Sequence, residues 1–307
     1  MWLTQAGALT PLRTKPAAYG FPRFSPDGRR LAMAIADGPQ FDIWVYDWER
    51  DILTRVTTNP GTDIGPVWTP DGTGLVFASA RDSSILNLFW QRADGTGSAV
   101  RLTTSETSQI PDSIDPEGQR VVFHAGDPAT GRQELGVLPI HRDGPAVKAG
   151  TPETLIGGAF LKANARISPD GKWMAYAALD SGQFEIYVQP FPGLGERVQV
   201  SNGGGNLVAW APRKSELYYA GSGQTRMMVV PYTVSGGAFA ASRPRPWTET
   251  VFSATPPVSA YGPGFDLHPD GERFAVTPVP PISDTSAAQL VLLFNFFDEL
   301  RRIAPIR

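Results

Sequence analysis

The sequence predicts an all-β protein: a six-bladed β-propeller of four-stranded antiparallel blades. Two observations carry this prediction, a short phrase that recurs six times and a set of strand-like segments that follows each copy of it. The intervals between the phrases are 44, 46, 53, 43 and 57 residues, the size of one four-stranded blade. The phrases are centred on Pro26, Pro70, Pro116, Pro169, Pro212 and Pro269.

Each phrase has the composition of a tight turn between two strands. In the first one, Phe24-Ser-Pro-Asp-Gly28, proline sets its own φ, aspartate tolerates the next position, and glycine accepts the positive φ of a hairpin exit. An apolar residue precedes the turn, and an apolar run begins two residues after it. The fifth phrase departs from this pattern, with Arg213 and Lys214 in place of the acid and the glycine, which predicts a longer or looser hairpin there.

The segments after the phrases supply the remaining strands, because they are rich in β-branched and aromatic residues. We predict second strands at 31–35, 75–78, 121–123, 173–177, 217–220 and 274–276. We predict third strands at 42–46, 86–90, 134–140, 184–189, 226–232 and 289–294. We predict fourth strands, in five of the six units, at 54–57, 100–103, 153–156, 197–200 and 248–251.

The sixth unit lacks a fourth segment, whereas residues 7–12 form a strand-like segment ahead of the first phrase. We predict that this N-terminal strand completes the sixth blade as its outer strand, beyond a third strand at 289–294. Joining the two ends of the chain in one blade closes the ring and protects strand edges. Residues 1–307 are thus predicted to form a single propeller domain, with a short C-terminal helix at 295–303 covering the closing blade.

Composition excludes several classes of partner. The net charge is −3 and the basic residues are scattered, whereas nucleic-acid binding needs a concentrated basic surface. The longest apolar run, at 290–294, is far shorter than a membrane-spanning helix of about 20 residues. The sequence contains no cysteine, so disulfides and thiol chemistry are excluded. We expect a monomer that binds no nucleic acid and does not insert into a membrane.

The search for catalytic motifs gives negative results. The string Gly95-Thr-Gly-Ser-Ala99 lacks the last glycine of a nucleophile elbow, and Gly203-Gly-Gly205 leads into a strand instead of the helix that a phosphate-binding loop requires. The three histidines, His124, His141 and His268, are widely separated in the sequence. We therefore predict no cofactor, and keep as an alternative a divalent cation such as Ca²⁺ held near the axis by carboxylates and carbonyls.

The candidate binding residues lie where the chain enters each phrase, since function on a propeller is expected at one end of the central channel. The predicted channel mouth consists of Tyr19, Asp63, Gln109, Lys162, Asn164, Asn206 and Tyr261. These residues differ from blade to blade although the phrase barely changes. A mixed polar and aromatic ring suits a small polar ligand or a peptide segment. Ordinary solvated loop residues are the alternative interpretation.

The phrase Ser-Pro-Asp-Gly, followed by two residues and an apolar strand, resembles the repeats of TolB-like propellers. Longer strings resemble the C-terminal propeller domains of bacterial serine/threonine protein kinases over almost the whole chain. These strings are 42–47, 66–72, 168–176, 185–192 and 295–300. The resemblance implies a sensor or protein-interaction module on the extracytoplasmic or periplasmic side. The chain has no kinase motifs, so kinase activity is not implied.

Two hypotheses of function follow. The preferred one is a non-catalytic propeller, of sensor or scaffold type, that binds a protein, a peptide or a small polar ligand at the mouth of its channel. The alternative is a lactonase-like hydrolase or lyase that uses a divalent cation at the axis, for which Asp63, Gln109, Asn164 and Asn206 are the candidate ligands. The propeller of a prolyl-oligopeptidase-type enzyme is not expected, because the repeats leave no room for a hydrolase domain.

Overall fold

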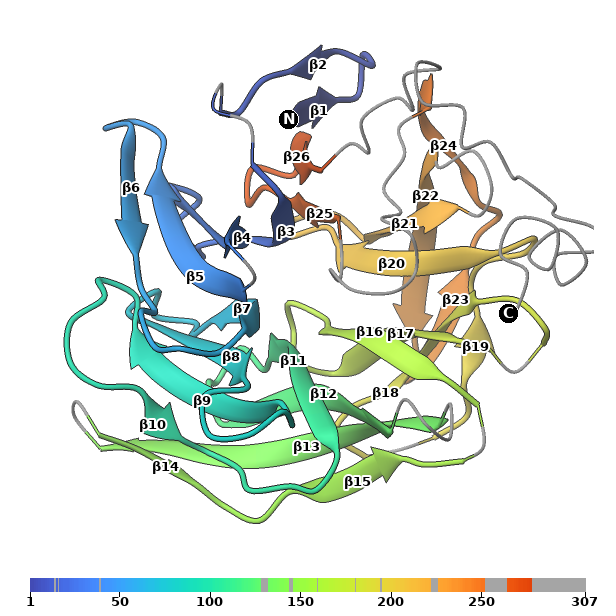
Figure 1. The fold of residues 1–307 in the computed structure, drawn as a ribbon. Helices are drawn as coiled ribbons and strands as arrows, with labels where there is room; N and C mark the ends of the chain where they lie inside the picture. Colours follow the sequence, from blue (N-terminus) through green and yellow to red (C-terminus); the bar gives the residue numbers. More distant parts are fainter. Residues whose placement is uncertain are drawn as a thin grey trace, which may run out of the picture.

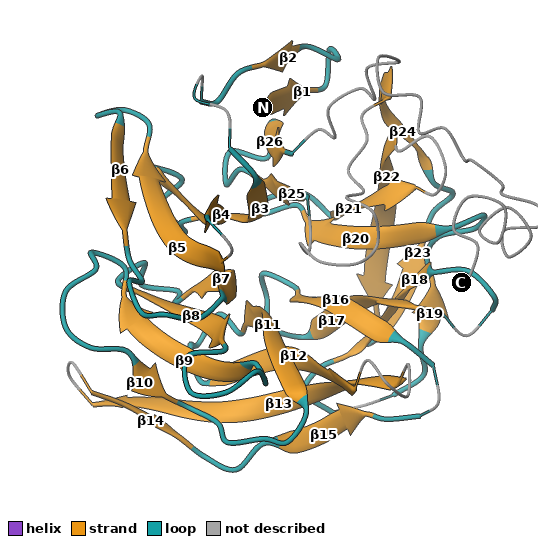
Figure 2. Cartoon of the chain, in the orientation of Figure 1, coloured by secondary structure: helices purple, strands orange, loops and turns teal. Residues whose placement is uncertain are grey.

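The computed structural model describes residues 1–277 except 14, 16, 39, 128–131, 144–145, 159, 180, 194, 222–225 and 252–263. Within these residues every regular element is a β-strand, and the strands form six antiparallel sheets (Figure 2). The sheets are the blades of a propeller and surround a central axis (Figure 1). The predicted fold class is confirmed.

Blades one, two and four have four strands each, in chain order from the axis outward. Blade one consists of β3 (Tyr19–Phe24), β4 (Arg30–Asp37), β5 (Gln40–Asp47) and β6 (Ile52–Arg55). Blade two consists of β7 (Asp63–Trp68), β8 (Gly74–Ser79), β9 (Asn87–Arg92) and β10 (Val100–Arg101). Blade four consists of β16 (Lys162–Ile167), β17 (Trp173–Ala178), β18 (Glu185–Pro190) and β19 (Val198–Gln199). The strands predicted for these blades overlap the observed ones throughout.

Blades three and five each carry an extra strand. Blade three consists of β11 (Ser108–Ile114), β12 (Arg120–Asp127), β13 (Arg132–Asp143), β14 (Ala146–Ala149) and β15 (Glu153–Ile156). Blade five consists of β20 (Gly205–Trp210), β21 (Glu216–Gly221), β22 (Arg226–Ser235), β23 (Ala238–Ala241) and β24 (Arg245–Val251). The long third strand pairs with the expected fourth strand, β15 or β24, and then extends into a hairpin with β14 or β23. These hairpins account for the two longest intervals between phrases.

The sixth blade is closed by the N-terminus, as predicted, but with two strands instead of one. Its order from the axis is β25 (Phe265–Leu267), β26 (Arg273–Val276), β1 (Trp2–Thr4) and β2 (Leu9–Thr10). Leu3 of β1 lies opposite Phe274 and both are fully buried. The place that we predicted for residues 289–294 is therefore taken by β1, because the hairpin of β1 and β2 brings its own apolar residue to the sheet. Residues 289–294 and the predicted helix at 295–303 lie outside the described residues.

The repeated phrase folds into one recurring turn. In the first phrase Gly28 N donates to Ser25 O at 2.8 Å. The Ser25 hydroxyl donates to the Asp27 carboxylate and accepts from Arg30 N at 2.9 Å. The glycine has a positive φ in every phrase that contains one, at Gly28, Gly72, Gly118, Gly171 and Gly271. The phrase residues thus satisfy one another's polar groups.

The fifth phrase forms a hairpin of the same length, so our prediction of a longer one is wrong. Ala211 N donates to Glu216 O at 2.9 Å, the same sequence spacing as Ser25 N to Arg30 O in the first phrase. Inside this turn Glu216 N donates to Lys214 O at 2.8 Å. Closure of the hairpin depends on the backbone pairing of β20 with β21, which tolerates the loss of the acid and the glycine.

Hydrophobic side chains fill the space between neighbouring blades. Ile43 of blade one and Phe77 of blade two, for example, belong to one buried cluster and are fully inaccessible to solvent. Burial of this kind is worth about 25 cal/mol per Å² of apolar surface. Because each blade packs on the next, the ring is held between its blades and the innermost strands are left to line the axis.

Candidate channel site

The six innermost strands present one equivalent side chain each to the channel. In β3, β7, β11, β16 and β20 the pairing register shifts shortly before the phrase. Such a bulge re-aims the side chains that follow it. The residues directly before the six phrases all line a central cavity, and we call them the inner ring. They are Arg23, Val67, Ser113, Arg166, Ala209 and Asp266.

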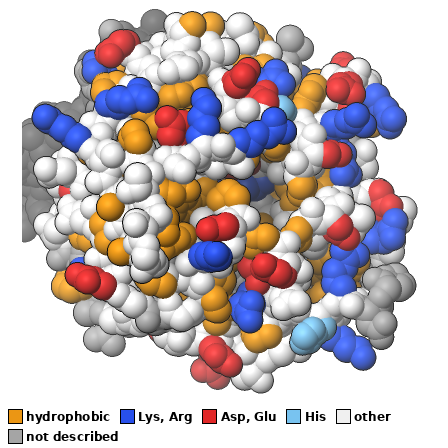
Figure 3. Space-filling model, turned by 180° about the vertical axis from the view of Figure 1, so that it is seen from behind, with side chains coloured by type: hydrophobic (Ala, Val, Ile, Leu, Met, Phe, Trp, Pro, Cys, Tyr) orange, Lys and Arg blue, Asp and Glu red, His pale blue; other side chains and the backbone are white. Residues whose placement is uncertain are grey.

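The cavity of about 380 Å³ also has a largely apolar wall. The wall is formed by the first residue of each phrase and by the phrase prolines. These residues are Phe24, Trp68, Ile114, Ile167, Trp210 and Leu267, with Pro26, Pro70, Pro116, Pro169, Pro212 and Pro269. Figure 3 shows a face that is hollowed at its centre, with hydrophobic side chains around the hollow. Apolar walls with a few converging polar groups are typical of ligand sites.

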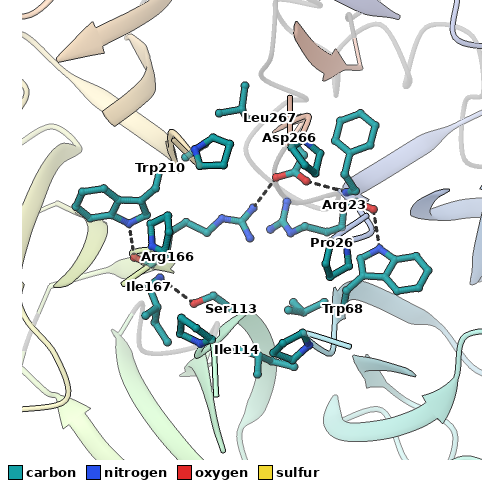
Figure 4. A pocket seen from close by; sticks show the side chains of 18 of the residues that line it. Arg23, Pro26, Trp68, Ser113, Ile114, Arg166, Ile167, Trp210, Asp266 and Leu267 are labelled. Carbon is teal, nitrogen blue, oxygen red and sulfur yellow. Dashed lines mark hydrogen bonds and ion pairs between the residues drawn. The ribbon is translucent and has the colours of Figure 1, made fainter. Parts of the chain in front are cut away.

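Two arginines of the inner ring face each other across this cavity. Arg23 belongs to blade one and Arg166 to blade four, on opposite sides of the ring, and their guanidinium groups point toward one another (Figure 4). The backbone of each is held by the next blade. Trp68 Nε1 donates to Arg23 O and Trp210 Nε1 donates to Arg166 O, both at 2.9 Å. Equivalent contacts therefore position the two arginines.

Arg166 has partners for its charge. Its Nη2 lies 3.5 Å from Asp266 Oδ1, and its Nη1 donates to the backbone oxygen of Asp112 at 2.9 Å. The other carboxylate oxygen of Asp266 accepts from Phe24 N at 2.8 Å. Burial lowers the pKa of Arg166, and the carboxylates of Asp266 and Asp112 oppose this shift. Arg166 and Asp266 thus form an ion pair at the edge of the cavity.

Arg23 is less well compensated. Only 5% of its surface is exposed, and its Nη1 donates to Pro22 O at 3.0 Å. Among the described residues, its Nε has no hydrogen-bond partner and no carboxylate forms an ion pair with it. Burial and then the charge of Arg166 lower the pKa of Arg23 to about 9, and the carboxylates of Asp266 and Asp112 oppose this shift. The guanidinium is therefore still charged at neutral pH. A buried cation of this kind costs stability unless it is paired.

A histidine and an aspartate lie next to the ring. Asp112, only 2% exposed, accepts from His124 Nδ1 at 3.1 Å through either carboxylate oxygen. Burial lowers the pKa of His124, but the charge and hydrogen bond of Asp112 outweigh it, so the pKa of His124 is raised. Asp112 therefore has a partner of its own.

The predicted mouth residues lie at the other end of the inner strands. Tyr19, Asp63 and Lys162 begin their strands, and Gln109, Asn164 and Asn206 follow within the first three positions. None of these six lines the cavity described above. Tyr261 lies outside the described residues. The predicted mouth thus lies toward the opposite end of the inner strands from the cavity, with Asn164 only two positions before Arg166.

Two of the predicted residues are brought together. Asn164 Nδ2 donates to Asn206 Oδ1 at 2.9 Å and links blades four and five. Asn164 also has a φ of +58° within the bulge of β16, a conformation that asparagine tolerates better than most residues. The geometry therefore gives Asn164 a backbone role as well as a place at the predicted mouth.

Polar contacts hold other members of the predicted mouth. The buried carboxylate of Asp63 lies 3.6 Å from Arg81 Nη2, and burial raises its pKa. The Tyr19 hydroxyl donates to Lys15 O at 2.5 Å. Lys162 is 5% exposed and Gln109 is 6% exposed. Tyr19 and Asp63 thus have different partners.

The sequence analysis did not select Arg23, Arg166 or Asp266. A signal was available, because each directly precedes a phrase and this position varies from blade to blade while the phrase repeats. What the sequence did not show was the register shift in the inner strands. In five of the six inner strands that shift comes just before this position, which lines the cavity.

The described residues offer neither a cluster of metal ligands nor a membrane-spanning helix. In the described part of the chain, no group of three or more His, Asp or Glu residues could hold a metal ion. Within the same part, no helix is long and apolar enough to cross a membrane. The divalent cation of the alternative hypothesis thus gains no support from the described side chains.

Comparison with known sequences identifies the repeat. Residues 4–143 match the PD40 family, the TolB beta propeller domain. The uncharacterised protein Atu1656 of Agrobacterium fabrum is 29% identical over 176 residues, which cover 57% of this chain and 59% of that protein. TolB of the Tol-Pal system of Helicobacter pylori is 29% identical over 99 residues, 32% of this chain and 23% of TolB. The chain thus matches less than two thirds of the length of these bacterial relatives.

Solved structures share the architecture. A protein assigned as TolB from Agrobacterium tumefaciens has a TM-score of 0.64 and 14% identity, covering 87% of this chain and 93% of its own. TolB from Acinetobacter baumannii has a TM-score of 0.51 and 16% identity, covering 85% of this chain and 63% of its own. The ring of six blades with its recurring turn defines a β-propeller. More narrowly, residues 4–143 of this six-bladed propeller match the repeats of TolB-like propellers, which the phrase predicted.

Proposed function

We propose that this propeller is a non-catalytic binding module, of sensor or scaffold type, that holds a protein segment, a peptide or a small polar ligand in the cavity at one end of its channel. The observation that carries the proposal is the cavity inside the phrase turns. Repeated residues build its apolar wall, and the unrepeated inner ring adds two cations, an anion and a hydroxyl group. A wall of this kind excludes water, while a few charged groups fix the orientation of a ligand.

Proteins of similar fold include both a member of a protein complex and an enzyme. One neighbour comes from a nidogen/laminin complex, with a TM-score of 0.55 and 11% identity over 70% of this chain and 76% of its own. Another is a puromycin-hydrolyzing peptidase of Mycobacterium tuberculosis, with a TM-score of 0.57 and 17% identity, of which the chain covers 43%. At these identities the likeness concerns the fold alone. The binding function therefore depends on the cavity of this chain.

The proposal is tested by blocking the cavity. Peptides selected from a display library on the purified protein would be measured against Ser113→Phe, which places a ring inside the cavity. Ser83→Phe adds the same ring to an exposed loop and serves as the control. We expect Ser113→Phe to abolish binding and Ser83→Phe to keep it, with both variants still showing cooperative thermal unfolding. Equal binding by both variants would refute a site in this cavity.

The predicted mouth at the other end of the inner strands is a separate proposal. Tyr19→Ala and Asn206→Ala remove side chains from that end without touching the cavity. If the ligand enters from that end, these variants weaken binding and Ser113→Phe leaves it intact. We also propose that the chain is a monomer, which light scattering on the eluting protein would check.

A metal-assisted hydrolase or lyase is the second candidate. Its support is one fold neighbour, an oligogalacturonate lyase in complex with manganese, with a TM-score of 0.50 and 13% identity over 86% of this chain and 90% of its own. A bound cation would raise the melting temperature by mass action. A rise with Mn²⁺ or Ca²⁺ that a chelator reverses would favour the enzyme, and no rise would favour the binding module.

A further inference from the structure

We propose that Arg23 and Arg166 form a binding site for one carboxylate group of the ligand. This inference rests on the proposed function, since it places the ligand in the same cavity, and it deepens that function by naming the ligand's chemistry. The two guanidinium groups come from opposite blades and point into one space (Figure 4). The planar fork of an arginine matches a carboxylate better than any other side chain does.

Of the two cations that face the cavity, Arg23 is the one without a direct ion pair among the described residues, and the carboxylates of Asp266 and Asp112 act on it only from farther away. Asp266 pairs with Arg166, and Asp112 pairs with His124. Arg23 has no carboxylate within ion-pair distance among the described residues. A single negative charge placed between the two arginines would complete this arrangement, because it would offset the cost of the buried Arg23 cation.

An unpaired donor marks the position of the ligand. The Nε–H of Arg23 is buried and has no partner within the described residues, and the side chain is directed into the cavity (Figure 4). Its backbone carbonyl is fixed by Trp68 at 2.9 Å. A donor held in place before binding loses little entropy when the ligand arrives. A carboxylate oxygen is therefore expected to accept from Arg23 Nε.

Acids of the phrases and bases that pair with them lie together around the rim of the cavity. Five phrase acids directly follow prolines that line the cavity, and their side chains are exposed. They are Asp27, Asp71, Glu117, Asp170 and Asp270. Hydrogen bonds lower the pKa of Asp71 to about 2 against the opposing effect of burial. Arg142 pairs with Asp71 and Arg273 pairs with Asp270, so the rim carries both signs of charge. The choice of a carboxylate therefore rests on Arg23, which forms no ion pair among the described residues and which one negative charge would match.

The C-terminus of a peptide and a free carboxylic acid present the same group, so both serve as probes. Sodium acetate would be compared with sodium chloride at equal ionic strength, by melting temperature and by the NMR signals of the arginine Nε–H groups. Peptides from the display selection would be compared as free acids and as C-terminal amides. We expect acetate alone to raise the melting temperature and shift the Arg23 signal, and free acids to bind at least about tenfold tighter than amides. Where a selected peptide binds through an Asp or Glu side chain, it would be compared with the same peptide carrying Asn or Gln at that position.

Arg23→Gln is the decisive variant, because it removes the guanidinium that has no direct ion pair among the described residues and leaves the Arg166–Asp266 pair intact. Arg50→Gln is the matched control, since the Arg50 side chain is 75% exposed and lies 3.8 Å from Asp47 on the protein surface. We expect Arg23→Gln to lose the acetate response and Arg50→Gln to retain it. An equal response in both variants, or no difference between acetate and chloride in the unaltered protein, would overturn the carboxylate site.

The two proposals fail in different ways. If Ser113→Phe abolishes peptide binding while acids and amides bind equally well, the channel module stands and the carboxylate inference is wrong. If Ser113→Phe leaves peptide binding unchanged, the module itself is wrong at this cavity.

Discussion

The phrase turns and the inner ring are adjacent in the chain and in space, yet they differ in what they repeat. In the phrase turns, nearly the same residues recur, and polar groups find partners within the turn, as Ser168 does with Asp170 and with Trp173 N. In the inner ring, the residue type changes along the blades, and Arg23 keeps a buried donor without a partner among the described residues. In a repeat protein, the recurring residues build the scaffold, and the varying position next to them is free to define a ligand.

Substitutions in the two regions should change the free energy of unfolding in opposite directions. Removing a phrase side chain leaves unpaired polar groups or a cavity and destabilises the fold. Removing the charge of Arg23 relieves a buried cation and should stabilise it. This contrast of sign is the main experimental consequence of the comparison.

The largest expected effect is that of Trp68→Ala. Trp68 is 6% exposed, stands first in its phrase, and donates from Nε1 to Arg23 O. Loss of its bulk should lower the free energy of unfolding by about 3–5 kcal/mol, measured by chemical denaturation. Trp68→Phe keeps most of the bulk and loses the hydrogen bond, so its cost should be smaller. Equal costs for the two variants would mean that packing contributes little at this position.

A smaller loss is expected for Ser168→Ala. The Ser168 hydroxyl donates to Asp170 and accepts from Trp173 N at 3.0 Å, so alanine leaves a buried backbone donor unpaired. The expected loss is about 1–3 kcal/mol in the free energy of unfolding. Ser181→Ala, on an exposed loop where the hydroxyl contacts Gln183 O, is the control and should change stability little. A loss no greater than that of the control would show that the phrase turn does not need its hydroxyl.

The repeat made the ring predictable, since turn chemistry and strand composition recur six times and support one another. The third strand of the last blade was not predictable. Trp2–Thr4 is a short segment, and its place beside β26 depends on long-range pairing of Leu3 with Phe274. The inner ring was not predictable either, because the bulge before Arg23 and Arg166 follows from backbone pairing. Only the variation at that position was visible in the sequence.

Arg23→Met should act in the opposite direction from the phrase variants. Methionine has a similar length and no charge, so the buried cation beside Arg166 is replaced by apolar packing. We expect the free energy of unfolding to rise by about 1 kcal/mol or more. Arg50→Met, at an exposed site, should leave it nearly unchanged. A clear loss of stability in Arg23→Met would show that Arg23 supports the fold and would remove the contrast between the two regions.

The smallest expected effect concerns the pH dependence of stability through His124. The pKa of His124 is raised in the folded protein by Asp112. A raised pKa means that the folded state holds the proton more tightly than the unfolded chain does. The stabilisation is thus fully present below the unfolded pKa of about 6.5 and is lost as the pH rises through the folded pKa. The stability difference between the unaltered protein and His124→Gln should therefore decrease as the pH rises from that value.

The His124 experiment also tests whether the inner ring is coupled to β12, the second strand of blade three, where His124 lies. His141→Gln, at an exposed position, is the control and provides the reference for general effects of pH on a substituted histidine. A difference for His124→Gln that stays constant with pH would contradict the ion pair with Asp112. If the difference does decrease, the ion pair of Asp112 depends on the protonation of His124. Asp112 also contacts the inner ring, because its backbone oxygen accepts from Arg166. Protonation of His124 would then stabilise the strand that supports one of the two arginines, so ligand affinity and stability should weaken together over the same pH range.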